Sequence, residues 1–284
     1  MESNTANQVE LDAKAIAATR PDALSPAETE AKAEAVAVTK ASMPSAKCFV
    51  SAMLAGAFIA FGGMYFCLFM GDSSMSFAVQ RVAGAVSFCL GLVLVLCCGA
   101  ELFTGNSLMC CAKASGKISW GGLARNWVIV WVGNLIGALV IVALVYFAKM
   151  YTMNGGGVGE AMVSVAASKV SPDWITLFVK GIVCNMLVCL AVWIGFSART
   201  VIDKFVGVIF PISAFVACGY EHCVANMFFL PTGFLLNSLG IGAEGAVTLA
   251  GVASNLSAAT LGNLVGGLAI GMAYWFIYSK RKRG

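Results

Sequence analysis

Apolar residues dominate the chain from about residue 48 onward, in runs long enough to cross a lipid bilayer. Six runs can be counted, and each is near or above the roughly 20 residues that a membrane-spanning helix needs. The sequence therefore predicts an all-α membrane protein with six transmembrane helices. The runs cover residues 48–70, 82–99 with a continuation at 106–112, 126–148, 174–198, 205–236 and 256–278.

Two of these runs contain the same polar motif. Residues 98–106 read Cys-Gly-Ala-Glu-Leu-Phe-Thr-Gly-Asn and residues 218–226 read Cys-Gly-Tyr-Glu-His-Cys-Val-Ala-Asn, so Cys-Gly, Glu and Asn recur at the same spacing. A second pair of similar segments, 133–139 and 262–268, follows in the same order. Ionisable groups at membrane depth usually face a cavity or the bundle interior, and broken backbone there must be buried or line a cavity.

The repeated motif predicts how the two halves of the chain are related. Gly99 and Gly105 bracket an expected interruption of the second span, and Gly219 marks one in the fifth. Three spans lie in each half, so the halves run in opposite directions across the bilayer. This arrangement is typical of inverted repeats, in which interrupted helices meet near the midplane and frame the solute path.

Composition excludes several other classes of protein. The 284 residues are 60% hydrophobic and 11% charged, with a mean hydropathy of +0.86, far from an ordinary soluble domain. Most of the eleven cysteines lie within the apolar runs, where cysteine behaves as a small hydrophobic residue. No Cys-x-x-Cys pair occurs and there is one histidine. We therefore expect no metal, no other cofactor and no enzymatic activity.

Polar segments flank the expected channel domain, residues 47–279. Residues 1–46 form a polar tail in which Ser25 and Pro26 resemble the start of a helix that continues to about Thr39. Residues 280–284 form a basic tail. If six spans are drawn, most basic loop residues fall on one side, so the positive-inside rule predicts that both termini are cytoplasmic. These residues are Lys113, Lys117, Arg125, Arg199 and Lys204, against Arg81, Lys149 and Lys169 on the other side.

The chain resembles the formate/nitrite transporter family from about Lys40 to Tyr278. The resemblance rests on the Glu-Leu-Phe-Thr motif at 101–104, on residues 113–117 and 184–193, and on the Glu-His-Cys-Val-Ala-Asn-Met motif at 221–227. It implies an aquaporin-like fold, a homopentamer with one pore in each protomer, and a plasma-membrane channel or transporter for small monovalent anions. Bacterial formate channels are the most similar members, which favours formate, with nitrite second.

The resemblance also implies roles for individual residues. Thr104 falls on the loop that interrupts the second span, His222 on the loop that interrupts the fifth, and Asn185 near the histidine. By the same resemblance, these three residues line the substrate path. Phe88, Leu92, Phe215, Leu102 and Phe103 match constriction positions. Lys40 and Lys169 match positions at the two pore mouths, and Lys180 is an additional cation that departs from the bacterial formate channels.

Structural roles remain open for several of these residues. Glu101 and Glu221 are expected to hold the broken loops together with Asn106 and Asn226, since an exposed carboxylate would repel an anion. Thr104 is also a candidate cap for the half-helix that follows it. The aromatic and leucine positions are equally compatible with an ordinary apolar core.

A comparison of energies favours passage of the neutral acid. A bare anion in a dry apolar constriction carries a cost of tens of kcal/mol, whereas a helix N-terminus returns only about 0.3–2 kcal/mol. Protonating a carboxylate of pKa roughly 4 at pH 7 costs about 4 kcal/mol, and a histidine, with an ordinary pKa of about 6.5, is a suitable donor. The alternative is an aquaporin-like channel for neutral solutes, although no Asn-Pro-Ala motif is present. Passive and proton-coupled transport both remain open.

Overall fold

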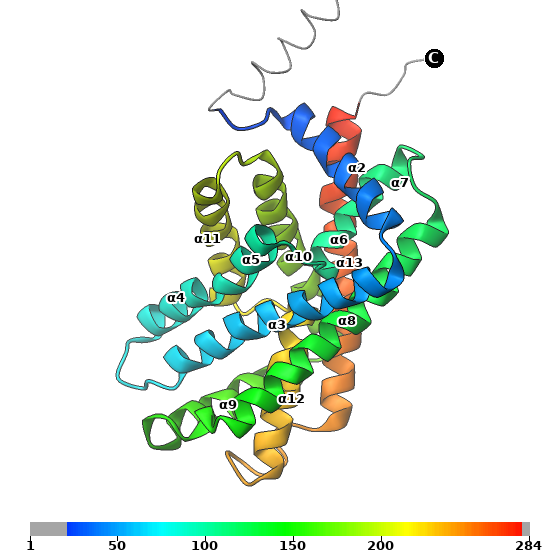
Figure 1. Cartoon of the computed structure of the whole chain (residues 1–284). Coiled ribbons are helices and arrows are strands. Elements are labelled where there is room, and N and C mark those ends of the chain that lie inside the picture. Colours follow the sequence, from blue (N-terminus) through cyan, green and yellow to red (C-terminus); the bar gives the residue numbers. More distant parts are fainter. Residues whose placement is uncertain (1–21, 280–284) are drawn as a thin grey trace, which may run out of the picture.

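The computed structural model describes residues 22–279, and all regular elements in this range are helical (Figure 1). Five segments are long and apolar enough to cross a membrane: Ser45–Met70, Phe77–Gly99, Trp120–Phe147, Trp174–Ser197 and Leu249–Tyr278. The all-helical membrane class predicted from the sequence is therefore confirmed. The elements are α2 (Pro26–Ser42), α3 (Ser45–Met70), α4 (Phe77–Phe88), α5 (Leu90–Leu94), η1 (Val95–Gly99), α6 (Phe103–Asn106), η2 (Ser107–Met109), α7 (Cys110–Ala114), α8 (Trp120–Phe147), η3 (Met150–Thr152), η4 (Asn154–Gly156), α9 (Gly157–Val170), α10 (Trp174–Ser197), α11 (Val201–Ala217), α12 (Cys223–Ser238) and α13 (Leu249–Tyr278).

Two predicted spans are interrupted by a glycine with positive φ. The second apolar segment ends at Gly99, which has φ +82°, and the chain stays extended until α6 begins at Phe103. The fifth is broken at Gly219, with φ +71°, between α11 and α12. A residue with a side chain rarely adopts such values, so glycine lets the helix stop here. The predicted second boundary at Gly105 is wrong, because Gly105 lies inside α6.

Glycine also lets the long helices pack in two close pairs. α3 packs against α8, and α10 packs against α13. A Cβ atom on Gly137 of α8 would overlap the carbonyl group of Met53 in α3, and one on Gly266 of α13 would overlap the carbonyl group of Ile182 in α10. Small residues at such positions allow membrane helices to approach backbone to backbone.

Polar segments of the chain meet at one end of the bundle. Helix α2 starts with Ser25 as its N-cap in a capping box with Glu28, and it lies across the ends of α7, α10 and α13 (Figure 1). Lys32 of α2 donates to the carbonyl oxygen of Phe196, and Lys117 pairs with Glu34. The remainder of the two tails, residues 1–21 and 280–284, lies outside the described range.

Helix α9 was not expected from the sequence. It spans 14 residues and directly follows the glycine-containing turn η4. Its length and its Gly, Ala and Ser content hide it from a search for membrane spans. The helix packs on α12, and it carries Lys169 near its C-terminal end.

Candidate functional site

The side chains of Thr104 and His222 meet in the interior of the bundle. Thr104 lies at the start of α6 and His222 immediately before α12, so each belongs to one of the two interrupted segments. The Oγ1 atom of Thr104 is 3.0 Å from the Nε2 atom of His222, and both side chains are buried. The two breaks in the helices therefore bring one hydroxyl and one imidazole into direct contact.

The hydrogen bonds of His222 define the state of its ring. Its Nδ1 atom accepts a hydrogen bond from the backbone N–H of Ala225 at 3.0 Å, which makes His222 the N-cap of α12. An accepting Nδ1 carries no proton, so the neutral ring has its proton on Nε2. His222 therefore donates this proton toward the hydroxyl oxygen of Thr104.

Two asparagines hold the breaks in place from neighbouring helices. Asn134 of α8 accepts from the backbone N–H of Phe103 at 2.9 Å and donates to the carbonyl oxygen of Glu101 at 2.9 Å. Asn263 of α13 makes the matching bonds to Cys223 at 2.8 Å and Glu221 at 2.8 Å. Because an unpaired buried backbone group is costly, these amides stabilise the broken backbone.

The first polar cluster surrounds the buried carboxylate of Glu101. Lys40 donates to it at 2.7 Å and to the Oδ1 atom of Asn106 at 2.8 Å. The amide of Asn106 donates to Glu101 at 2.7 Å and to Asn126 at 2.9 Å. Glu101 is thus held by an ion pair and by amides, and Lys40 is not an isolated cation.

The second polar cluster, around Glu221, repeats this arrangement with one difference. Glu221 accepts from Lys169 at 3.2 Å, from Asn226 at 2.7 Å and from Asn255 at 3.0 Å. The Oδ1 atom of Asn226 has no hydrogen-bond partner among the described residues, whereas the equivalent atom of Asn106 accepts from Lys40. The ammonium group of Lys169 is therefore less fully engaged than that of Lys40.

Asn185 lies behind Thr104. Its amide nitrogen is near three acceptors, the carbonyl oxygens of Thr104 at 3.2 Å and Asn263 at 2.6 Å and the hydroxyl of Ser107 at 3.2 Å. The Oδ1 atom of Asn185 is buried and has no hydrogen-bond partner within residues 22–279. Asn185 thus fixes the backbone of Thr104 from α10 and links it to α13.

A cavity of about 350 Å³ ends at His222, and we call it the Lys169 vestibule. Phe88 and Phe215 line it, and their rings are 5.9 Å apart in an edge contact. The ring of Phe215 also stacks on His222 at 5.7 Å. The vestibule is further lined by Arg81, Lys169 and Lys180.

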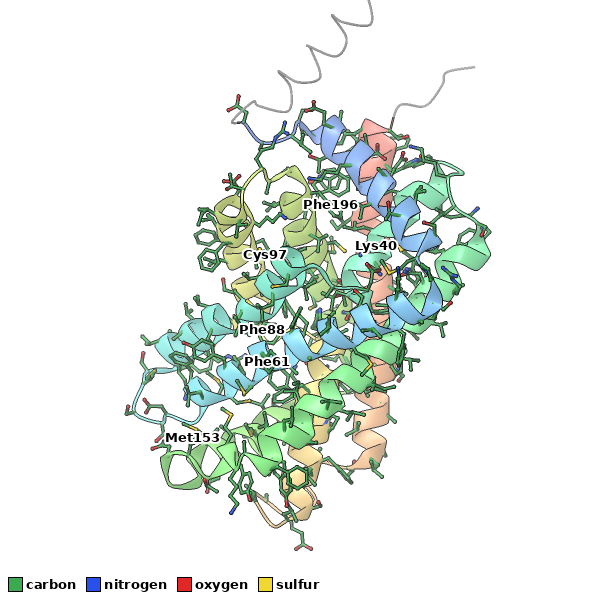
Figure 2. All side chains as sticks on the ribbon, in the orientation of Figure 1. Lys40, Phe61, Phe88, Cys97, Met153 and Phe196 are labelled. Carbon is green, nitrogen blue, oxygen red and sulfur yellow. The ribbon has the colours of Figure 1, made fainter. Side chains whose placement is uncertain are left out.

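A smaller cavity of about 50 Å³ lies near Glu101, and we call it the Lys40 vestibule. Leu102, Gly105 and Phe196 line it together with Lys40. Figure 2 shows Lys40 and Phe196 toward the α2 end of the bundle and Phe88 nearer its middle. His222 lines the Lys169 vestibule, Thr104 lines neither vestibule, and no described residue lines both.

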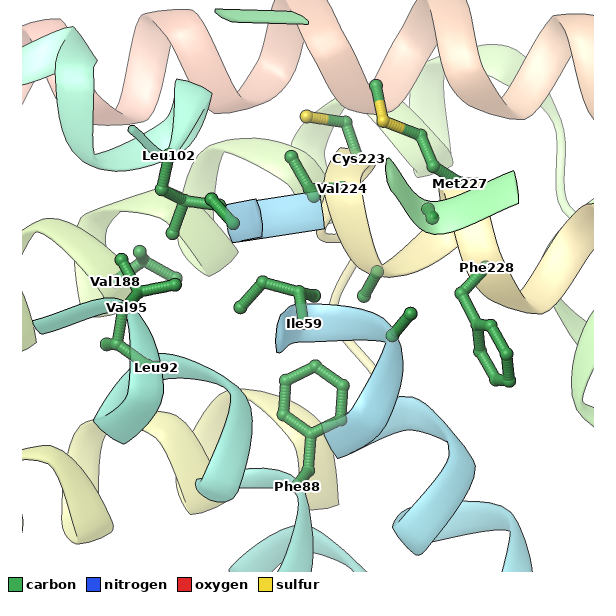
Figure 3. Packing of buried hydrophobic residues seen from close by; sticks show 14 of the residues in the cluster. Ile59, Phe88, Leu92, Val95, Leu102, Val188, Cys223, Val224, Met227 and Phe228 are labelled. Atoms are coloured by element: carbon green, nitrogen blue, oxygen red, sulfur yellow. The ribbon is translucent and has the colours of Figure 1, made fainter. Parts of the chain in front are cut away.

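The other expected constriction residues have different surroundings. Leu92 is buried in an apolar cluster with Val95, Leu102 and Val188 (Figure 3) and lines neither vestibule. Phe103 lines a separate apolar groove between α8 and α13, which Trp127 and Trp131 also line. The structure therefore brings Phe88 and Phe215 to one cavity and Leu102 to the other, but places Phe103 away from both.

Two sequence-based expectations for Thr104 need correction. Thr104 lies within α6 rather than on the preceding loop, and the N-cap position is occupied by Leu102, whose side chain makes no capping bond. The threonine hydroxyl therefore does not cap the half-helix, and its contact is with His222.

Sequence reasoning gave no site role to several residues of the site, including Asn134 and Asn263 in the repeated segments. Asn126 and Asn255 complete the two polar clusters, and each lies eight residues before the asparagine that holds the break, Asn134 or Asn263. This repeated spacing was a usable signal. Arg81 had been counted only as a loop charge, yet it lines the Lys169 vestibule.

The chemistry available at the centre is hydrogen bonding and proton transfer. Thr104 and His222 can both donate to an anion, while the two carboxylates are occupied by lysine and amide partners. No group of three or more candidate metal ligands occurs within residues 22–279. The arrangement is suited to guiding a small solute between two cavities.

Comparison with known proteins gives one consistent result. The formate/nitrite transporter family model matches residues 27–276. The formate channel FocA of Escherichia coli K12 is 38% identical over 90% of this chain and 95% of its own length. The nitrite transporter NirC of the same organism is 36% identical over 83% of this chain and 85% of its own.

Solved structures agree with this result. A pentameric formate channel with formate bound aligns with a TM-score of 0.77 at 37% identity, covering 82% of this chain and 97% of that channel. An FNT family ion channel aligns with a TM-score of 0.78 at 30% identity, covering 88% and 98%. The similarity thus extends over the whole channel domain rather than over isolated motifs.

Proposed function

Because the chain belongs to the formate/nitrite transporter family, we propose that it conducts small monovalent anions across a membrane, with formate first and nitrite second. The contact between Thr104 and His222 carries the proposal. His222 lines the Lys169 vestibule, and Leu102 and Gly105, which flank Phe103 and Thr104 in the chain, line the Lys40 vestibule. The protein is a channel or transporter and not an enzyme.

The proposed architecture is a pair of inverted three-helix repeats in an aquaporin-like fold, with six spans and interrupted second and fifth helices. The matching bonds of Asn134 and Asn263 and the matching clusters around Glu101 and Glu221 support it. Similarity to a pentameric formate channel supports a homopentamer. A plasma-membrane location with both termini cytoplasmic agrees with the basic segments near 32, 117 and 199, which lie at one end of the bundle.

Energetics favour conversion of the anion at the centre of this path. Phe88, Phe215 and Leu102 are apolar and buried, so a bare anion among them would lose its hydration at a cost of many kcal/mol. Formic acid requires only the cost of protonation, about 4 kcal/mol at pH 7. The neutral acid is therefore the species that crosses between the two vestibules.

His222 supplies the proton in this mechanism. The arriving anion favours the imidazolium form, in which Nδ1 takes up a hydronium proton that reaches it from solution through the Lys169 vestibule, and both nitrogens carry hydrogen. The Nε2 proton then passes to the carboxylate oxygen of formate, which leaves the neutral ring protonated on Nδ1. Loss of the Nδ1 proton to solvent and uptake of one at Nε2 restore the starting form. While the ring is charged, Nδ1 has no free lone pair, so the bond from Ala225 must open during each cycle.

Proteoliposome uptake of formate from about pH 5 to 8 tests the mechanism. We expect uptake in the wild type to rise with an inward proton gradient. The variants His222→Asn and His222→Phe should lose this response. Asparagine can still cap α12 but does not titrate, so it separates proton transfer from helix capping. An unchanged pH response in a correctly folded His222→Asn protein would refute the relay.

Thr104 gives a second test with a matched control. Thr104→Ala should lower uptake about tenfold or more, because a buried hydrogen bond to a charged group contributes about 1.5–3 kcal/mol. Thr104→Ser keeps the hydroxyl and should retain most of the flux. The competing function is a channel for neutral solutes. It predicts uptake of small uncharged solutes, and formate uptake that does not depend on the proton gradient.

A further inference from the structure

More basic than acidic residues line the Lys169 vestibule. Arg81, Lys169 and Lys180 line it, and Glu221 is its one acidic lining residue. The pair between Lys169 and Glu221 leaves Arg81 and Lys180, and neither forms an ion pair with any residue in 22–279. The cavity therefore carries an excess of two positive charges.

Arg81 is held in a fixed position. Its Nε and Nη2 atoms donate to the carbonyl oxygen of Ala217 at 3.2 Å and 3.1 Å, at the C-terminal end of α11. Its guanidinium lies 6.0 Å from the ring centre of Phe66. These contacts keep the group beside the break at Gly219 without cancelling its charge.

Lys169 faces the same cavity with donors to spare. An ammonium group has three N–H donors, and the described contacts give Lys169 one acceptor, Glu221. The equivalent lysine in the other half of the chain, Lys40, has two acceptors, Glu101 and Asn106. An oxyanion in the Lys169 vestibule can therefore accept from Lys169 without breaking its ion pair.

The two vestibules differ in both charge and size. In the Lys40 vestibule the lysine is balanced by Glu101, and the volume is about 50 Å³. The Lys169 vestibule has about 350 Å³, more than a monovalent anion of formate size needs. The larger cavity thus has room and charge for a second anion or for an anion of higher charge.

We propose that Arg81, Lys180 and Lys169 form an anion-binding site in the Lys169 vestibule that holds small dianions in front of the Thr104–His222 contact. The proposal rests on the proposed anion path for its effect on flux, but binding itself does not depend on that path. A dianion such as sulfate stays charged throughout the pH range of transport. Since the Born energy rises with the square of the charge, its cost in the constriction is about fourfold that of formate. Sulfate should therefore bind and block, but not pass.

Sulfate inhibition of formate uptake tests the effect on flux. Right-side-out and inverted membrane vesicles are compared at constant ionic strength, with gluconate replacing sulfate in the controls. We expect external sulfate to raise the apparent KM for formate about threefold or more in one orientation only, with little change in the maximal rate. Equal inhibition in both orientations, or no inhibition while formate flux is normal, would overturn the proposal.

Matched variants assign the effect to this cavity. Lys180→Gln should remove most of the sulfate inhibition, and Lys180→Arg should retain it. Lys149→Gln removes one charge from an exposed lysine outside the vestibule and should behave like the wild type. Equal loss in Lys180→Gln and Lys149→Gln would show a general surface-charge effect and would refute the site.

A binding measurement keeps this inference separate from the proposed function. Sulfate that binds the native state raises its melting temperature, and we expect a rise about 2–4 °C larger in the wild type than in Lys180→Gln. Lys149→Gln controls for the general stabilisation that sulfate gives any protein. If the sulfate-induced rise in melting temperature depends on Lys180 but the protein shows no formate flux, the proposed function alone is refuted. Equal shifts in all three proteins would sink the vestibule site.

Discussion

Replacing Lys40 with methionine removes the cation that pairs with the buried Glu101. Methionine has a similar length and no charge, so the change isolates the ammonium group. In the wild type this group donates to Glu101 at 2.7 Å and to Asn106 at 2.8 Å. The variant leaves a carboxylate with 6% side-chain exposure and no ion-pair partner within the described residues.

The expected cost follows from these contacts. Removing one member of a buried ion pair costs about 3–5 kcal/mol. Lys40 retains 20% side-chain exposure, and Glu101 keeps the bond from Asn106 at 2.7 Å, so the cost should lie at or just below the lower end of that range. We expect a loss of about 2–3 kcal/mol, which corresponds to a fall of about 5–10 °C in melting temperature.

The assay is thermal unfolding of the purified protein in detergent, with two further variants. Lys40→Met combined with Glu101→Gln removes both charges and should recover at least half of the loss. Lys47→Gln changes an exposed lysine of α3 and should leave the melting temperature within about 1 °C. The reasoning fails if Lys40→Met has the same melting temperature as Lys47→Gln, or if the double variant is no more stable than Lys40→Met.

Two further predictions concern packing and pH. Gly137→Ala should destabilise the protein by about 1–3 kcal/mol in the same assay, because the new methyl group overlaps the carbonyl group of Met53, and an unchanged melting temperature would contradict the close packing. Burial, and then the neighbouring Glu34, raise the pKa of Glu30 in α2 from 4.5 to about 7. Between pH 4.5 and about 7, Glu30 is therefore protonated in the folded state but ionised in the unfolded state. Protonation of Glu30 thus stabilises the docked α2, fully below pH 4.5, and this contribution is lost as the pH rises through 7. Hydrogen exchange in α2, corrected for intrinsic rates, should accelerate from pH 6 to 8 in the wild type but not in Glu30→Gln.

The sequence was sufficient for the features that leave a local signal. Ser25 and Pro26 mark the start of α2, and the structure begins this helix at Pro26. Gly99 and Gly219 mark the two breaks because each position needs a positive φ. The repeated Glu and Asn spacing identified residues that lie in the two polar clusters.

Other features depend on contacts between distant segments. The pairing of Lys40 with Glu101 joins residues 61 positions apart, and no local pattern reports it. Phe103 lines a groove between α8 and α13, and this position depends on how α6 packs against those two helices. Helix α9 is short and only moderately apolar, so it lacks the signal of a membrane span.

The glycine contacts between the paired helices bear on how the protein responds to its surroundings. Asn134 and Asn263, which hold the two breaks, sit on helices whose spacing is set by main-chain atoms rather than by interdigitating side chains. Main-chain contacts have no alternative rotamers, so a change in temperature or in lipid thickness has few ways to alter their separation. The distance between threonine and imidazole at the centre should consequently vary little from one membrane to another, and acyl-chain length should affect transport less than substitutions at these glycines do.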